Sequence, residues 1–190
     1  MTRILVLTTL LWSLILPVSM LAQGKSAPAG PDPQMVEKIE KAGGRVMAIA
    51  QNDDRLEIDF HLQSADVTDQ SLACLDGLKK VYSLNLGKTK ITDAGLAHVA
   101  GLTSLNRFYL QETKINDKGL THLKNLHDLV YLNLYGTAVT DQGLEHLAGL
   151  TNLKNLYVWQ SKVTDAGIAK LKKSLPNVNI VSGTEPEPKK

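Results

Sequence analysis

The sequence predicts an α/β solenoid, a right-handed coil with a parallel sheet on its concave side and short helices on its convex side. Two observations predict this class. Apolar residues recur every 24 residues in four consecutive units, which begin at Leu78, Leu102, Leu126 and Leu150. Within a unit the apolar spacing changes from two residues at Leu84 and Leu86, as in a strand, to three at Leu96 and Val99, as in a helical turn. One unit cannot bury its apolar side alone, so the units must stack.

The first residues predict an export signal. Arg3 supplies a positive charge, residues 4–16 form an apolar run, and a region of small residues ends at Ala22, which is the layout of a secretory signal peptide. We assign residues 1–22 to this signal and expect an exported protein that is periplasmic, on the cell surface or extracellular. The alternative is an uncleaved membrane anchor, because residues 4–22 carry no charge and ~20 apolar residues span a bilayer. A membrane is expected as a partner only in that case.

Two segments have a composition that is typical of chain without a core. Residues 23–33 (QGKSAPAGPDP) hold three Pro, two Gly and no large apolar side chain, which predicts a flexible linker. Residues 184–190 (TEPEPKK) are polar and rich in Pro, and we expect a disordered tail.

Caps are expected at both ends, because a bare terminal repeat exposes its core. We assign residues 34–53 to an N-terminal cap, in which the apolar spacing predicts a helix over 34–42 that ends at Gly43 and Gly44. Residues 45–50 are expected to form a strand. At the other end, residues 174–183 are assigned to a C-terminal cap that closes with a short strand.

Five repeats are expected between these caps, over residues 54–173. The first of them is degenerate, as is usual for a repeat beside a cap. Its apolar residues are aligned 24 positions before Leu84, Leu86, Ile91, Leu96 and Val99, which gives Phe60, Leu62, Val67, Leu72 and Leu75.

The four regular units contain a multi-position motif. It reads LNLGKTKITDAGL, YLQETKINDKGL, LNLYGTAVTDQGL and YVWQSKVTDAGI. This motif resembles the leucine-rich repeat family in the form L-x-x-L-x-L-x-x-T-x-[IV]-T-D-x-G-L, close to the cysteine-containing subclass, although Thr replaces the usual Asn or Cys at the strand end. The resemblance covers Asp54 to about Leu175 and is strongest to small exported bacterial members that end with a KSLPNVNI-type segment, here residues 173–180. It implies protein recognition on the concave sheet.

Composition and motifs argue against several function classes. The 21 Lys and Arg nearly balance 19 Asp and Glu, so the excess positive charge of a nucleic-acid-binding protein is missing. The single cysteine, Cys74, allows no disulfide within the chain. The sequence contains no Gly-rich phosphate loop, nucleophile elbow or clustered acid pair. We therefore expect no enzyme and no cofactor.

Identical polar residues form three columns when the units are stacked. An acidic column consists of Asp69, Asp93, Asp117, Asp141 and Asp165. A calcium ladder is one interpretation, but calcium takes 6–8 oxygen ligands, and Thr-Asp before a helical turn is typical of helix capping. We therefore predict capping by these residues.

The other two columns receive structural interpretations as well. A hydroxyl column is expected to bond the backbone of the neighbouring turn, and it contains Thr89, Thr113, Thr137 and Ser161. A further column could suggest zinc, and it contains Cys74, His98, His122, His146 and Lys170. The helical turns place these side chains between buried leucines, facing solvent, and too far apart to share one ion at ~2.0–2.1 Å. We expect an exposed polar face and no metal.

The outward-facing strand positions differ from the columns in being rich in aromatic residues. Four of the five Tyr lie on the last three predicted repeat strands, together with one of the two Trp. The corresponding positions of the first two strands are small or polar: Asp59, His61, Gln63, Ser83, Asn85 and Gly87. Tyr, Trp and Arg dominate interface energetics, whereas strand propensity alone does not require them to cluster on one face. The predicted partner-binding residues are Arg107, Tyr109, Tyr131, Asn133, Tyr135, Tyr157 and Trp159.

The function favoured by these patterns is recognition without catalysis. We expect a module that binds a protein partner on the concave sheet, with the aromatic residues in contact and Arg107 and the Asn side chains setting orientation. A carbohydrate-binding module is one alternative, because stacked aromatics beside amides also suit sugar rings. A structural or self-assembling protein of the cell envelope is the other.

Overall fold

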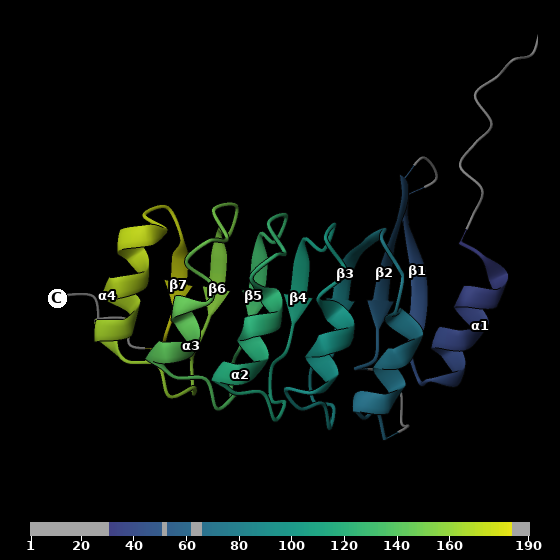
Figure 1. The fold of residues 1–190 in the computed structure, drawn as a ribbon, viewed down its shortest axis with the longest axis horizontal. Coiled ribbons are helices and arrows are strands. Elements are labelled where there is room, and N and C mark those ends of the chain that lie inside the picture. The colour runs from purple at the N-terminus through teal and green to yellow at the C-terminus, as the bar shows by residue number, and fades with distance from the viewer. Residues whose placement is uncertain (1–30, 51–52, 62–65, 184–190) are drawn as a thin grey trace, which may run out of the picture.

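The computed structural model describes residues 31–50, 53–61 and 66–183 of the 190-residue chain. The predicted signal peptide, most of the predicted linker and the predicted tail lie outside the described residues. The described chain forms a seven-stranded sheet whose strands follow one another in sequence order. Figure 1 shows these strands side by side, with short helices in a row along them. The predicted α/β solenoid of the leucine-rich repeat type is confirmed.

The sheet begins with an antiparallel hairpin and continues as a parallel ladder. The hairpin consists of β1 (Arg45–Ala50) and β2 (Asp53–Asp59). Each later strand pairs in parallel with the one before it; these are β3 (Val81–Asn85), β4 (Arg107–Tyr109), β5 (Tyr131–Asn133), β6 (Asn155–Tyr157) and β7 (Asn179–Val181). From β3 onward the paired residues are 24 apart, with Leu84 opposite Phe108 and Leu132 opposite Leu156. The hairpin covers the first edge of the repeats.

Short helices form the second layer. The chain enters through α1 (Pro33–Lys41), where the Asp32 side chain accepts a hydrogen bond from the Gln34 N–H at 3.0 Å and Gly43 follows with φ 90°. The predicted helix over 34–42 is therefore present. The repeats contribute the 3-10 helices η1 (Asp69–Leu75), η2 (Gly95–Val99) and η3 (Thr121–Leu123), and the α-helices α2 (Asp117–Leu120), α3 (Asp141–Glu145) and α4 (Asp165–Ser174).

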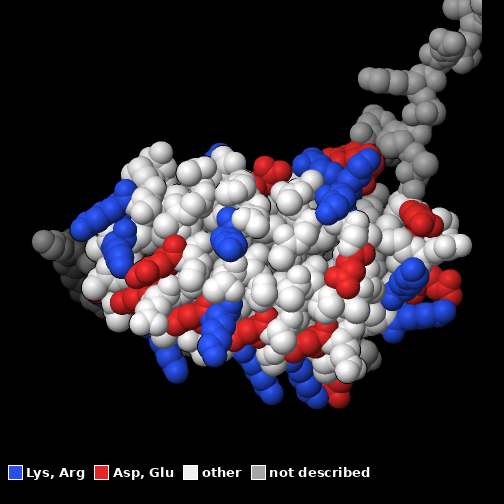
Figure 2. All heavy atoms as spheres, in the orientation of Figure 1, with Lys and Arg blue, Asp and Glu red and all other residues white. Residues whose placement is uncertain are grey.

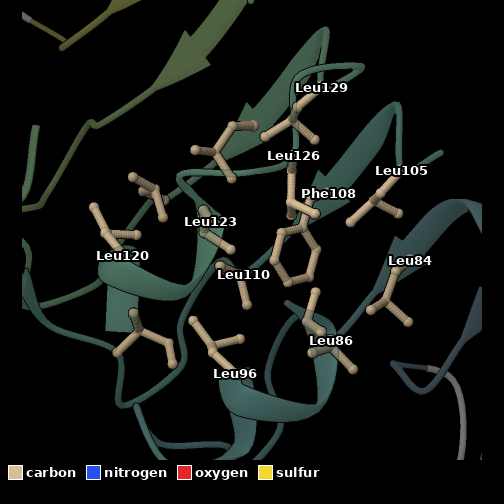
Figure 3. Packing of buried hydrophobic residues seen from close by; sticks show 14 of the residues in the cluster. Leu84, Leu86, Leu96, Leu105, Phe108, Leu110, Leu120, Leu123, Leu126 and Leu129 are labelled. Carbon is tan, nitrogen blue, oxygen red and sulfur yellow. The ribbon is translucent and has the colours of Figure 1, made fainter. Parts of the chain in front are cut away.

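The core lies between the two layers and repeats with the units. Phe108 and Leu110 of one unit pack among Leu84, Leu86 and Leu96 of the unit before it (Figure 3). All five side chains are fully buried, and burial of such a side chain stabilises the fold by about 1.5–3 kcal/mol. The core therefore continues from unit to unit without a boundary.

The alignment of the first repeat was wrong in its strand. Ile58 pairs with Leu84, and Glu57 pairs with Ser83, so the register here is 26 residues. Further along the unit the spacing is 24 again, because the Lys90 N–H donates to the Val67 carbonyl as the Lys114 N–H donates to that of Ile91. The first repeat therefore has two more residues after its strand β2 than the later repeats have after theirs. The outward positions of β2 are shifted toward the N-terminus, from the predicted Asp59, His61 and Gln63 to Glu57, Asp59 and His61, and Gln63 lies outside the described residues.

The acidic column bonds neighbouring repeats, which corrects the prediction that these Asp residues cap helices. The Asp117 carboxylate reaches the next unit, where it accepts the Thr140 N–H and the Thr140 hydroxyl, both at 2.7 Å. Asp69 and Asp141 bind Thr92 and Thr164 of their following units in the same way, at 2.6–2.8 Å. We call these contacts, with the bond from the Asn116 N–H to Asp93 at 2.8 Å, the carboxylate ladder. Capping of the local helix is instead performed by Asn116, Thr140 and Thr164.

A glycine in each receiving unit makes room for the incoming carboxylate. A Cβ atom at Gly95, Gly119, Gly143 or Gly167 would lie within 2.5 Å of the Asp Oδ1 from the preceding unit. Atoms cannot approach so closely, so a side chain at these positions would displace the carboxylate. The repeated T-D-x-G segment therefore holds both partners of the ladder. Its Asp carboxylate extends into the next unit as an acceptor, and its Thr donates to the carboxylate from the preceding unit, for which the Gly leaves room.

The hydroxyl column acts within its own unit. Thr113 and Thr137 are buried, and their hydroxyls donate to the carbonyl oxygens of Leu110 and Leu134 at 2.7 Å. Thr89 and Ser161 donate in the same way to the carbonyls of Leu86 and Val158. The predicted bond to the neighbouring turn is thus replaced by a bond three residues back, which closes the turn at the end of each strand.

Candidate functional site

The seven predicted binding residues lie on the sheet face, on three adjacent strands. Two rows of side chains cross this face along paired residues. The first row reads Glu57, Ser83, Arg107, Tyr131, Asn155 and Asn179, and the second reads Asp59, Asn85, Tyr109, Asn133, Tyr157 and Val181. A third row follows from backbone hydrogen bonds beyond the strands and contains Gly87, Gln111, Tyr135 and Trp159. The alternation within each strand thus places all seven residues on one face.

Three tyrosines from neighbouring strands form a continuous cluster, here called the aromatic strip. The ring centroids of Tyr109 and Tyr131 are 4.9 Å apart, and those of Tyr131 and Tyr157 are 5.2 Å apart. The Arg107 guanidinium carbon lies 5.4 Å from the Tyr131 ring centroid and 5.8 Å from that of Tyr109, within the range of a cation–π contact. Burial, and then the neighbouring Tyr109 and Tyr157, raise the pKa of Tyr131. These contacts hold four of the predicted residues in one arrangement.

Tyr135 and Trp159 form a second aromatic pair beside the strip. Their ring centroids are 5.3 Å apart. The Trp159 indole lies against Gly183, where any Cβ atom would overlap it. Trp159 is still 50% exposed, and within residues 31–50, 53–61 and 66–183 no other large hydrophobic side chain is exposed. Trp159 is therefore the apolar side chain of this face that is most open to solvent among the described residues.

Some amide side chains of this face form hydrogen bonds within the protein. The Asn133 Oδ1 accepts the Tyr135 N–H at 3.0 Å, as the Asn85 Oδ1 accepts the Gly87 N–H. Asn133 therefore holds the chain where it leaves β5. The Gln111 side chain lies over Gly87, and its Oε1 is buried without a hydrogen-bond partner in the described part of the chain.

A hollow of about 220 Å³ lies beside the aromatic strip on the same face, and the sequence did not predict it. It is lined by Met47, Glu57, Ile58, Asp59, Ser83, Asn85, Arg107 and Tyr109. Its floor is low because β3 presents Ser83 and Asn85 where β4 presents the larger Arg107 and Tyr109. The sequence analysis missed Glu57 because the register assigned to the first repeat was wrong by two residues. The small outward residues of β3, Ser83 and Asn85, were the sequence signal that could have indicated a depression.

The helix side carries Lys and Arg interspersed with Asp and Glu (Figure 2). The His98 Nδ1 lies 2.8 Å from the Asp76 Oδ1, and Lys170 binds Glu145 at 2.5 Å. No group of three His, Cys, Asp or Glu that could hold a metal occurs among the residues that the structure describes. The Cys74 thiol donates to the Ser71 carbonyl, and burial raises its pKa to about 11, so it stays protonated and is a poor nucleophile.

No helix in residues 31–50, 53–61 and 66–183 is long and apolar enough to cross a membrane. The predicted anchor alternative concerns residues 4–22, which lie outside this part.

Comparisons with known proteins match the chain to solved structures only. No family model matches, and no curated protein matches. One of the similar solved structures is internalin C2 from Listeria monocytogenes, with 28% sequence identity over 63% of this chain and a TM-score of 0.49. The chain spans about half the length of that structure, since the match covers 50% of it. The fold assignment made above rests on the sheet order and register of this chain.

Proposed function

We propose that this chain is a protein-recognition module without catalytic activity, which binds a partner on its sheet face. The observation that carries this proposal is the aromatic strip on β4, β5 and β6 together with the Tyr135–Trp159 pair just beyond β5 and β6, in which Trp159 is half exposed. Exposed apolar clusters on a rigid surface mark interaction sites, and Tyr, Trp and Arg supply most binding energy at interfaces. The same surface is stiffened by the sheet, so little entropy is lost on binding.

We further propose where the protein is located and how the chain is divided into segments. We propose that residues 1–22 are a signal peptide, that 23–33 link it to a cap over 34–53, and that 54–173 hold the five repeats. The C-terminal cap is residues 174–183, and 184–190 form the tail. The protein is exported, and its partner is periplasmic, on the cell surface or extracellular.

The first test asks which face contacts the partner. A photo-crosslinking amino acid is placed at Tyr135 or Trp159, and at the exposed His146 of the helix side as a control. We expect adducts from the two sheet positions and none from position 146. Adducts from position 146 alone would overturn the proposal.

A matched pair of variants measures the contribution of the aromatic pair. Tyr135→Ala with Trp159→Ala should weaken partner binding by at least about 100-fold, since hot-spot truncation costs roughly 2 kcal/mol or more per residue. His146→Ala should leave binding unchanged. The melting temperature reports whether the variants remain folded. Unchanged binding by a folded double variant contradicts the proposal. If the wild type binds a soluble glycan and the double variant does not, the carbohydrate alternative is favoured. If the protein forms concentration-dependent polymers, the structural alternative is favoured.

A further inference from the structure

The hollow beside the aromatic strip differs from the strip in chemistry. Its floor is Ser83, which is only 9% exposed and whose hydroxyl has no hydrogen-bond partner among the described residues. The buried side-chain atom that lacks a partner in the described residues is the Gln111 Oε1, so the Ser83 hydroxyl reaches the space of the hollow and is available to a ligand. The walls are Glu57 and Asp59 on β2, and Arg107 and Tyr109 on β4.

The charges around the hollow favour a cation. Glu57 and Asp59 contribute two negative charges and Arg107 one positive charge, so the lining has a net charge of −1. Arg45 stands opposite Asp59 on β1 but forms no ion pair with it in the described part of the chain. The Arg107 guanidinium lies over the Tyr131 ring at 5.4 Å, which holds it on the side of the aromatic strip. An anion in the hollow would be repelled by the two carboxylates. A cation would be attracted by them, and the Arg107 guanidinium, which lies over the Tyr131 ring, would oppose it less.

The carboxylates of the hollow are poorly neutralised compared with their neighbours. Asp53 forms an ion pair with Arg55 at 2.6 Å, and Asp54 forms one with Lys80. Glu57 has no ion pair or side-chain hydrogen bond within the described part of the chain. A half-buried carboxylate without a cation is an unfavourable arrangement that a bound cation would relieve.

Asp59 is held in place for such a contact. Its Oδ1 accepts the His61 N–H at 2.7 Å, and its Oδ2 accepts the Asn85 side-chain N–H at 3.1 Å. Each of these oxygens retains a free lone pair. Together with Glu57 and the Ser83 hydroxyl, Asp59 supplies enough acceptors for the three N–H donors of an ammonium group.

From these observations we propose that the hollow binds a cationic side chain, lysine or arginine, of the protein partner. The ammonium or guanidinium group binds Glu57, Asp59 and the Ser83 hydroxyl, and the aliphatic stem packs on the Tyr109 ring, as such stems do on apolar surfaces. This inference rests on the proposed function and specifies the partner: it presents a basic residue about 10 Å, two strand spacings, from the apolar groups that contact Tyr131.

The test uses n-butylammonium, which has the shape and charge of a lysine side chain. The probe is titrated into the isotopically labelled protein, and backbone amide signals are followed by NMR. We expect saturable shifts at Ser83, Asn85 and Asp59. n-Butanol, the neutral analogue, and butyrate, the anionic one, should produce no saturable shift there.

A pair of variants separates the hollow from the general surface charge. Glu57→Gln should weaken n-butylammonium binding by about tenfold, since a charge-assisted hydrogen bond is replaced by a neutral one. Glu40→Gln, on the exposed side of α1, should leave it unchanged. Equal effects of the two variants, an equal response to n-butanol, or stronger binding of butyrate would each overturn the proposal, provided that thermal unfolding shows both variants folded.

The two proposals fail separately. If the Tyr135 and Trp159 double variant loses its partner but n-butylammonium does not bind, the hollow is rejected and the recognition surface remains. If n-butylammonium binds and the double variant keeps its partner, the aromatic surface is rejected and the cation site remains.

Discussion

The carboxylate ladder and the sheet face use polar and aromatic residues in opposite ways. In the ladder the same residue occupies the same place in each unit, and Asp69, Asp117 and Asp141 each bind the unit that follows. On the sheet face the residue changes from unit to unit, and Glu57 and Trp159 remain available to solvent. The acidic column therefore bonds one repeat to the next, whereas the hydroxyl column closes a turn within its own repeat. Variation among outward positions indicates where a partner can be recognised.

Removing one carboxylate from the middle of the ladder should have the largest effect. Asp117→Ala deletes two hydrogen bonds and leaves the Thr140 N–H without a partner, which should lower the free energy of unfolding by about 2 kcal/mol. Asp165→Ala is the matched control, because no further Thr-Asp unit follows it in the sequence. It should cost less than about 1 kcal/mol, the usual value of an acidic residue at a helix N-terminus. Urea unfolding of both variants measures the difference, and equal losses would show that the ladder contributes nothing beyond local helix stability.

The receiving glycine should be the next most sensitive position. In Gly143→Ala the new Cβ would lie 2.4 Å from the Asp117 Oδ1 and 2.9 Å from the Val139 Cγ1, so we expect a loss of about 1–2 kcal/mol, in the lower part of the range for overpacked sites. Gly149→Ala, in the same unit, meets nothing within 4 Å and should be neutral or stabilise by up to about 1 kcal/mol.

A double-mutant cycle then tests the cause of the loss. If the Asp117 carboxylate is the obstacle, Gly143→Ala should cost less in the Asp117→Ala background than in the wild type. Additive losses in denaturant unfolding would assign the whole effect to Val139 and remove the explanation offered for the T-D-x-G motif.

The sequence predicted the repeat units and the aromatic face, but not the strand register of the first repeat. Four units could be aligned because no insertion interrupts them, and alternation within each strand sufficed to place Tyr109, Tyr131 and Trp159 on one face. The strand of the first repeat was misplaced because register depends on the length of the following turn, which apolar spacing does not reveal when only Phe60 and Leu62 mark the strand. The hollow was missed for the same reason, since its wall contains Glu57.

The Thr-Asp pattern was also insufficient to predict that the acidic column bonds neighbouring repeats. Thr-Asp before a helical turn fits capping equally well, and the direction of a carboxylate depends on the distance to the neighbouring unit. The glycine two residues later was the available signal, because a helical turn has no need of glycine at that position.

The smallest effect is expected from protonating one rung of the ladder. The Thr164 hydroxyl and N–H hold the pKa of Asp141 below its ordinary value. The unfolded chain then takes up this proton at a higher pH than the folded one, so the stabilisation is complete above about pH 4 and is lost as the pH falls through the folded pKa. Asp141→Asn cannot titrate, and its midpoint in urea should fall less steeply than that of the wild type below pH 4. Parallel curves would contradict the assignment.

Each unit of the ladder carries both halves of its joint, a forward-reaching Asp and a receptor built from Thr and Gly. The joints between regular units are therefore built from the same parts, with Asn116 in place of Thr at one of them, and the array has a built-in direction. A copy of one 24-residue unit, inserted between two others, would find a complementary neighbour on each side and widen the sheet by about 4.8 Å. The protein is in this sense a modular scaffold, whose length can be changed without redesigning its joints while its outward residues are chosen freely.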